Sequence, residues 1–289
     1  MTKIIVDSTC DLPDELLAKY DIITVPMQIL LDGKAYLDKL NIQPSDVYDA
    51  MRGGIVPKTA QVDLNYLEHA FEDCCKKGLD FIYLSFSSAL SCTHQSATIV
   101  LADMQEKYPD IHMAAVDSKG GSLATGLIAH QAAKLIEKGY DFDSVVSSVD
   151  DMISHVEHIL TIMDLKWLVK GGRIDPIKAA IGSLLNVKPI IDVKNGYMDI
   201  IKKVRGSNNA IMSLIEIMAD RIREFPEQLI GIAHTGNREA AESLKSKIAT
   251  RLGATNFIIS EIGSVLGAHI GIGALGVFFF NKKPALYIP

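Results

Sequence analysis

The stretch FIYLSFSSALSCTHQSA, residues 81–97, decides how this fold is expected to be organised. It begins as an apolar run typical of a buried strand, passes through a cluster of hydroxyl side chains that includes Ser91 and Thr93, and then takes on the composition of a helix. A strand that delivers hydroxyls to a helix N-terminus brings O–H donors, free backbone N–H groups and the positive end of the helix dipole together. A carboxylate or a phosphate is therefore the first ligand to consider.

Two other stretches of the first half repeat this pattern. Residues 3–6 lead into Asp7, and residues 111–116 lead into Asp117. Because strands alternate with amphipathic helices, the pattern predicts a parallel sheet covered by helices, with its ligand site at the carboxyl ends of the strands. For the two aspartates, helix capping is the preferred interpretation. The predicted helices of this half are residues 14–20, 45–51, 65–77, 92–108 and 122–139. Residues 57–61 are predicted to be a loop between two of them.

The pattern changes beyond residue 142. Residues 187–193 and 197–204 flank Asn195-Gly196 and give the clearest hairpin signal of the chain. The other predicted elements are strands 158–163, 229–234 and 257–262 and helices 144–155, 165–170, 177–185, 209–225 and 238–252. These elements predict an α/β fold of two domains. Residues 1–155 form an N-terminal parallel-sheet α/β/α domain with the ligand-binding loops, and residues 156–289 a smaller α/β domain with a mixed sheet.

Composition excludes several classes of function. The net charge of −6 over 289 residues argues against nucleic acid as a partner, because binding to its backbone needs a basic face. No apolar stretch approaches the ~20 residues of a membrane span, and the apolar run before Asp7 is too short for a secretory signal. The four cysteines show no CxxC spacing, which favours a reducing compartment. A cytoplasmic location is expected.

Two motifs resemble cofactor or metal sites but lack the required context. GIGALG, residues 271–276, fits GxGxxG, yet no clean strand precedes it and too few residues follow to complete a dinucleotide-binding unit. Its glycines are better explained by close backbone packing or by approach to a ligand. His155 and His158 lack the HExxH spacing of a zinc site. We therefore expect neither a cofactor nor a metal.

Two further segments carry candidate functional residues. His269 lies in a glycine-rich segment, where flexible backbone would let it approach an anion; a satisfied core histidine is the alternative. LKWLVKGGRIDP, residues 165–176, contains Lys166, Lys170 and Arg173. These three cations are either a solvated helix end or a docking surface for an acidic partner.

In order and spacing, the motifs of the chain resemble the DegV family of bacterial fatty-acid-binding proteins. The matching segments are DSTCDL at residues 7–12, TAQ at 59–61, SSALSCTHQSA at 87–97, DS at 117–118, LVKGGRI at 168–174, VKP at 187–189, HTG at 234–236 and HIGIG at 269–273. The resemblance spans essentially the whole chain, and it implies a lipid carrier rather than an enzyme.

The resemblance also implies a site and a partner. One long-chain fatty acid would lie in an acyl tunnel to which the second domain contributes, its carboxylate held by Thr59, Ser91 and His269. Supporting residues would be Ala60, Cys92, Thr93 and Gly271. The bound carboxylate would be phosphorylated by a fatty-acid kinase of the dihydroxyacetone-kinase-like type. Lys166, Lys170 and Arg173 would contact that kinase or, transiently, an anionic membrane. Ala60, Val62, Cys92 and Ile272 depart from the family pattern, which bears on acyl selectivity and head-group geometry.

Two alternatives stay open at this point. One is a hydrolase with Ser91 as nucleophile, His269 as base and Asp117 or Asp7 as the group that orients the base. It is the weaker interpretation because Ser91 lies outside any GxSxG elbow. The other is a binding protein for a different small acid.

Overall fold

The computed structural model describes residues 2–175, 186–223 and 225–289. The helix predicted at residues 177–185 lies outside these ranges. Within them the chain forms an α/β fold with a parallel sheet in its N-terminal half and a mixed sheet in its C-terminal half, as predicted.

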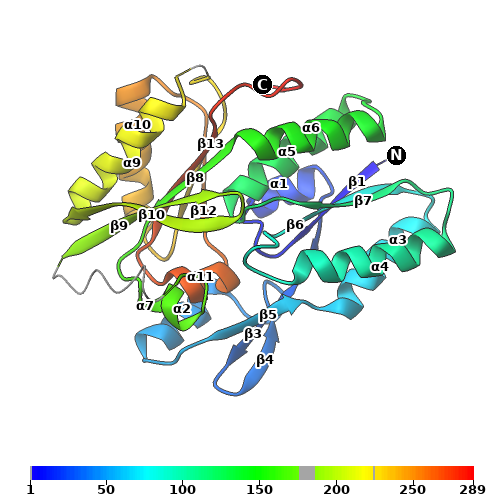
Figure 1. Cartoon of the computed structure of the whole chain (residues 1–289), viewed down its shortest axis with the longest axis horizontal. Helices are drawn as coiled ribbons and strands as arrows, with labels where there is room; N and C mark the ends of the chain where they lie inside the picture. The colour runs from blue at the N-terminus through cyan, green and yellow to red at the C-terminus, as the bar shows by residue number, and fades with distance from the viewer. Residues whose placement is uncertain (1, 176–185, 224) are drawn as a thin grey trace.

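The first sheet is parallel and covered on both faces. It contains β1 (Thr2–Asp7), β2 (Ile23–Val25), β6 (Asp80–Ser85) and β7 (Met113–Asp117), in the order β2-β1-β6-β7. Helices α3 (Leu64–Lys76) and α4 (Thr93–Lys107) lie on one face; α1 (Asp14–Lys19), α5 (Leu123–Glu137) and α6 (Phe142–His155) lie on the other (Figure 1). Ile4 and Val6 pack on one side and Ile5 on the other, which explains why the strands read as continuous apolar runs.

A small antiparallel sheet follows β2 along the chain. It consists of β3 (Met27–Leu31), β4 (Lys34–Leu37) and β5 (Lys58–Val62), in the order β4-β3-β5, with α2 (Pro44–Arg52) between β4 and β5. The prediction of a loop over residues 57–61 was wrong, because residues 58–62 pair with β3. The segment is short and half-polar, and its partner lies about thirty residues earlier, so no local pattern marks it as a strand.

The second sheet is mixed and has six strands in the order β10-β9-β8-β13-β11-β12. Its strands are β8 (Val156–Thr161), β9 (Val187–Lys194), β10 (Tyr197–Arg205), β11 (Ile230–His234), β12 (Phe257–Glu261) and β13 (Leu275–Phe280). The predicted hairpin is confirmed, and its turn residues Asn195 and Gly196 have φ of 51° and 86°. Helices α9 (Ser207–Arg221) and α10 (Arg238–Leu252) cover one face of this sheet (Figure 1).

The opposite face of the second sheet shares a core with the first sheet. Leu160 and Phe278 of the second sheet belong to the same buried cluster as Val6 and Leu84 of the first. Two short helices, α7 (Lys166–Lys170) and α11 (Ser264–Ile270), lie near α2 on the side of the small antiparallel sheet (Figure 1). A domain boundary between residues 155 and 156 stays a prediction.

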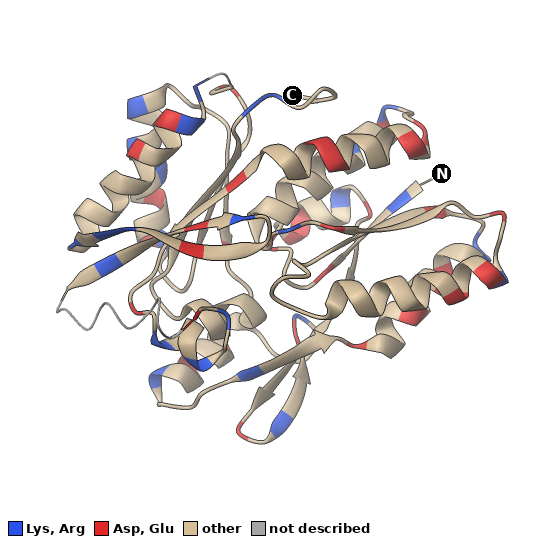
Figure 2. Cartoon of the chain, in the orientation of Figure 1, with Lys and Arg blue, Asp and Glu red and all other residues tan. Residues whose placement is uncertain are grey.

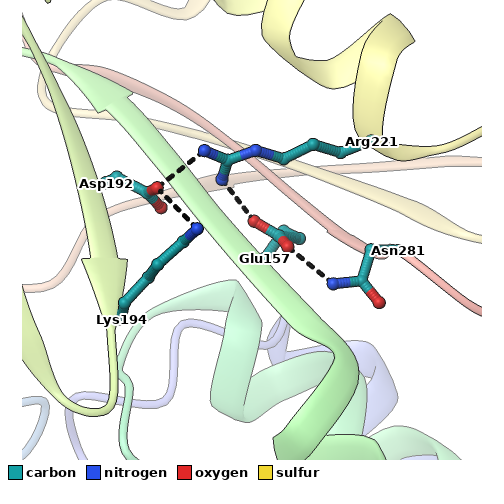
Figure 3. A network of polar contacts seen from close by, with 5 residues as sticks. All are labelled: Glu157, Asp192, Lys194, Arg221 and Asn281. Carbon is teal, nitrogen blue, oxygen red and sulfur yellow. Dashed lines mark hydrogen bonds and ion pairs between the residues drawn. The ribbon is translucent and has the colours of Figure 1, made fainter. Parts of the chain in front are cut away.

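A charged network fixes β8 and β9 against α9 (Figure 3). Arg221 of α9 donates to Glu157 and, at 2.7 Å, to Asp192, while Asn281 donates to Glu157 at 2.6 Å. Lys194 lies 3.6 Å from Asp192. Because both carboxylates are nearly buried, the guanidinium supplies the charge that burial would otherwise leave uncompensated. In the described parts of the chain, no helix is long and apolar enough to cross a membrane.

Candidate functional site

A cavity of about 190 Å³ lies where β5, the β6–α4 loop and α11 meet. Its wall carries six polar or thiol side chains: Thr59, Gln61, Ser91, Cys92, Arg173 and His269. The remaining lining residues, Ala60 among them, are apolar. Thr59, Ser91 and His269, which the family resemblance implied would act together, therefore share one cavity although they lie far apart in the chain.

Thr59 and His269 are in direct contact. The Nε2 of His269 lies 2.7 Å from the Oγ1 of Thr59. When Nε2 carries the proton, it donates to Thr59, and the threonine O–H is then free to donate to a ligand. The packing of α11 on β5 thus orients a hydroxyl donor toward the cavity.

Ser91 is held by Thr93 at the start of α4. The backbone N–H of Thr93 donates to the Ser91 hydroxyl at 3.2 Å, and the two hydroxyl oxygens are 2.9 Å apart. Thr93 is fully buried and its Oγ1 accepts from the backbone N–H of Val62 in β5 at 3.2 Å. Because Thr93 connects β5 with the β6–α4 loop, it fixes the position of Ser91 relative to Thr59.

The charge of the cavity comes from Arg173. Burial and the nearby Arg173 guanidinium lower the pKa of His269 to about 4, so the imidazole is neutral at physiological pH. Arg173 donates through Nε to the carbonyl of Leu90 at 3.1 Å and through Nη1 to the carbonyl of Gly171 at 2.6 Å. No carboxylate among the described residues forms an ion pair with it. A cavity with one uncompensated cation and two hydroxyl donors favours an anionic head group.

An apolar chamber continues from this cavity into the protein. Phe86, Leu90, Met198, Leu266 and Ile270 line both spaces, so the two are contiguous. Deeper in the chamber the wall includes residues of the second sheet: Leu160, Val193, Gly276 and Phe278. The chamber has a volume of about 50 Å³, and its almost entirely apolar wall favours carbon atoms over a polar group.

The tip of the β9–β10 hairpin closes one side of this chamber. The hydroxyl of Ser87, in the β6–α4 loop, donates to the carbonyl of Gly196 at 3.1 Å. A Cβ at Gly196 would lie 2.5 Å from that hydroxyl oxygen, so only glycine allows the hairpin to approach the loop this closely. This contact brings Met198 over the chamber.

The predicted supporting residues have different surroundings. Ala60 and Cys92 line the cavity, and Cys92 is exposed at its rim. Thr93 lies behind Ser91, as described above. Gly271 does not line the cavity: a Cβ there would lie 2.3 Å from the Trp167 ring, so Gly271 allows α7 to pack against the end of α11.

The three cations of the predicted docking surface have different surroundings. Lys166 and Lys170 are exposed on α7, with their ammonium groups 5.4 and 5.5 Å from the centre of the Trp167 ring. Basic positions are visible on the ribbon around α7 (Figure 2). Arg173 instead lines the cavity. The sequence pattern grouped Arg173 with the two lysines and did not assign it to the cavity, because its position depends on how the segment after α7 folds back over Leu90.

The catalytic constellation of the hydrolase alternative is not assembled. His269 bonds Thr59, and its Nδ1 has no hydrogen-bond partner among the described residues, so no carboxylate orients the ring. Asp7 accepts from the backbone N–H of Thr9 and of Phe86, and Asp117 accepts from Ser88 and Lys119. Both aspartates therefore fasten the loops at the strand ends. The helix-capping interpretation was wrong, because the N-caps of the helices that follow are Pro13 for α1 and Ser122 for α5. No group of three or more His, Cys, Asp or Glu in the described ranges could hold a metal ion.

Comparisons by sequence and comparisons by fold find proteins of the same family. The model of a family described as "Uncharacterised protein, DegV family" matches residues 1–282. A DegV domain-containing protein of Clostridium perfringens is 36% identical over 286 residues, covering 97% of this chain and 98% of that protein.

Two solved structures have the same fold. A DegV family protein from Thermus thermophilus, described by its fatty acid binding, superposes with a TM-score of 0.89 at 24% identity, covering 96% of this chain and 99% of that one. A fatty acid binding DegV family protein from Streptococcus agalactiae has a TM-score of 0.87 at 27% identity, covering 98% of this chain and 99% of that one.

Proposed function

The chain belongs to the DegV family, and on that premise we propose that it binds a long-chain fatty acid, buries the acyl chain and presents the carboxylate to a separate fatty-acid kinase. The observation that carries the proposal is the cavity shared by Thr59, Ser91, Arg173 and His269, which continues into an apolar chamber. The Streptococcus agalactiae protein, 27% identical to this chain, is described as fatty acid binding.

The division of the pocket into polar and apolar parts supports this assignment. Burying a methylene contributes roughly 0.8 kcal/mol, so a chain of about 15 methylenes offers on the order of 12 kcal/mol before ordering costs are subtracted. Hydrogen bonds from Thr59 and Ser91 to a carboxylate contribute about 1.5–3 kcal/mol each. The acyl chain thus supplies most of the affinity, and the hydroxyls determine which end of the ligand faces the rim.

The rim also suits transfer to an enzyme. Exposed Cys92 lies at the cavity, next to Ser91, so the head group would lie near the surface. The proposed partner is a kinase of the dihydroxyacetone-kinase-like type, which would transfer the γ-phosphoryl group of ATP to the carboxylate and give an acyl phosphate and ADP. In the proposal Lys166 and Lys170 contact the kinase or an anionic membrane, and Arg173 contributes from the rim.

Native mass spectrometry of the purified protein tests the binding step. We expect one monocarboxylic lipid per chain, released and identified after denaturation. The delipidated protein should take up one equivalent of stearic acid, and the double variant Thr59→Val, Ser91→Ala should bind it at least tenfold more weakly. Ser246→Ala on the exposed face of α10 is the control. A delipidated wild-type chain that binds no long-chain acid would contradict the proposal.

A coupled assay with a purified fatty-acid kinase, ATP and the loaded protein tests presentation. Charge reversal of Lys166 and Lys170 to Glu should leave stearic acid affinity unchanged, because neither residue lines the cavity, and should lower acyl-phosphate formation. The matched control reverses Lys245 and Lys247 on α10. Equal turnover by both charge-reversed proteins would remove α7 from the proposed docking surface.

A further inference from the structure

Gln61 occupies an irregular position of β5. The register of β5 against β3 shifts by one residue between Ala60 and Val62, so Gln61 has no partner on β3. An extra residue of this kind bends the strand and turns a side chain away from the direction that regular alternation would give it. Three successive residues, Thr59, Ala60 and Gln61, line the cavity, whereas regular alternation would turn one of them to the opposite face.

A hydrogen bond from α4 fixes which end of the Gln61 carboxamide faces the cavity. The hydroxyl of Ser96, in the first turn of α4, donates to the Oε1 of Gln61 at 2.9 Å, and Ser96 itself does not line the cavity. The Nε2 of Gln61 forms no hydrogen bond with another of the described residues, and it is not fully buried. Because Oε1 is turned toward α4, the two N–H donors of Nε2 remain for a ligand in the cavity.

These donors belong to a wall that carries no negative charge. Among the residues that the structure describes, no Asp or Glu lines the cavity. The guanidinium of Arg173 and the hydroxyls of Thr59 and Ser91 lie in the same wall. A hydrogen bond to an ionised acceptor is about twice as strong as one to a neutral acceptor. Each further N–H donor therefore widens the difference in affinity between a carboxylate and a neutral head group.

We propose that Gln61 donates a hydrogen bond through Nε2 to the head group of the ligand and makes the site selective for an ionised carboxylate over a neutral head group of the same chain length. Ser96 acts as a positioning residue, because it holds the carboxamide with its N–H donors toward the cavity. This inference rests on the proposed function and assigns a specificity-determining residue to the same site.

Binding of stearic acid and of octadecan-1-ol to the delipidated, full-length protein tests the inference. Gln61→Glu replaces Nε2 by an anionic oxygen and keeps an oxygen that can accept from Ser96. We expect this variant to bind stearic acid at least about tenfold more weakly than wild type, because a donor is lost and two negative charges meet. Its affinity for the alcohol should not fall. A variant that merely packs poorly would lose both ligands together.

Two further variants control for charge and for folding. Gln95→Glu adds the same charge to an exposed position of α4 that lines neither the cavity nor the chamber, so the preference for the acid should persist. Ser96→Ala leaves the carboxamide free to rotate, and it should lower that preference about two- to fivefold even if Gln61→Glu folds poorly.

Two results would overturn the inference and leave the proposed function intact. One is a Gln61→Glu protein that keeps the wild-type preference for stearic acid over octadecan-1-ol. The other is an equal loss of both ligands, which would mean that Gln61 only supports the fold. A wild-type protein that does not bind stearic acid overturns both the inference and the proposed function.

Discussion

The Nε2 of His269 lies 2.7 Å from the Oγ1 of Thr59, although 210 positions separate the two residues in the chain. One belongs to a short edge strand of the small sheet and the other to the last turn of α11. The head-group end of the cavity therefore exists only when the C-terminal part of the chain has packed against the N-terminal part. Changes that loosen this packing should act on ligand affinity before they act on the fold as a whole.

Replacing Thr59 by Val removes the hydroxyl and keeps the shape of the side chain. We expect the affinity for stearic acid to fall about 10- to 100-fold, because a hydrogen bond to a charged acceptor is lost and His269 loses its partner. Isothermal titration calorimetry of the delipidated protein measures the effect. Thr250→Val removes a hydroxyl from the exposed face of α10 and should change nothing. Equal affinities for the two variants would mean that Thr59 does not contact the head group.

Replacing Gly171 by Ala should displace the His269 ring. A Cβ at this position would lie 2.1 Å from the Nδ1 of His269, and an imidazole cannot yield as a long flexible side chain would. We expect about tenfold weaker stearic acid binding together with a shifted NMR signal of the His269 ring. Gly53→Ala, at the end of α2, meets its nearest atom at 3.3 Å and is the control. An unchanged ring signal would show that α7 moves instead.

Much of the fold could be predicted from local sequence pattern, whereas β13 and α11 could not. The strands of the first sheet and the hairpin at Asn195 carry their own signals, namely apolar runs before polar turns and an Asn-Gly pair. Every residue of β13 is buried, so it shows no alternation, and glycines interrupt the segment that precedes it. Its central place between β8 and β11 follows from tertiary pairing alone.

The candidate site also contains residues that local sequence pattern could identify and residues that it could not. Ser91 and Thr93 could be found locally, because a strand, a hydroxyl cluster and a helix follow one another in the sequence. Thr59 was identified only through the resemblance to a family, since its strand has no local signal. Arg173 was expected to share a partner surface with Lys166 and Lys170, and its place in the cavity wall depends on a contact with the carbonyl of Leu90 that no local pattern encodes.

Asp11 should make the stability of the protein fall as the pH rises. Its pKa is raised from 3.8 to about 7, chiefly by burial and to a smaller extent by nearby Asp38, against the opposing charge of Lys39. A carboxyl with a raised pKa in the folded state contributes stability below about pH 4, and this contribution is lost as the pH rises through 7. Asp11→Asn keeps an oxygen that can accept from the Gly263 N–H. The variant should therefore gain roughly 2–4 kcal/mol relative to wild type between pH 4 and pH 8.

Urea unfolding at several pH values measures this difference. Histidines 130, 158 and 269 act with the opposite sign, because their lowered pKa values remove stability as the pH falls from about 6.5 to 4. Subtracting the wild-type curve from that of Asp11→Asn cancels their contribution. A flat difference for Asp11→Asn would mean that this carboxyl does not titrate between pH 4 and pH 8.

Replacing Arg221 by Met should destabilise the whole second sheet. Its guanidinium contacts both Glu157 and Asp192, whose side chains are only 10% and 3% exposed (Figure 3). Removing one partner of a buried ion pair leaves uncompensated charge and typically costs about 3–5 kcal/mol. Arg223→Met removes an exposed cation that pairs with Asp220 on the surface, and its effect should be much smaller. Chemical denaturation measures the loss of stability in each variant. An equally small loss in both would mean that Arg221 acts through its aliphatic stem, which methionine retains, rather than through its charge.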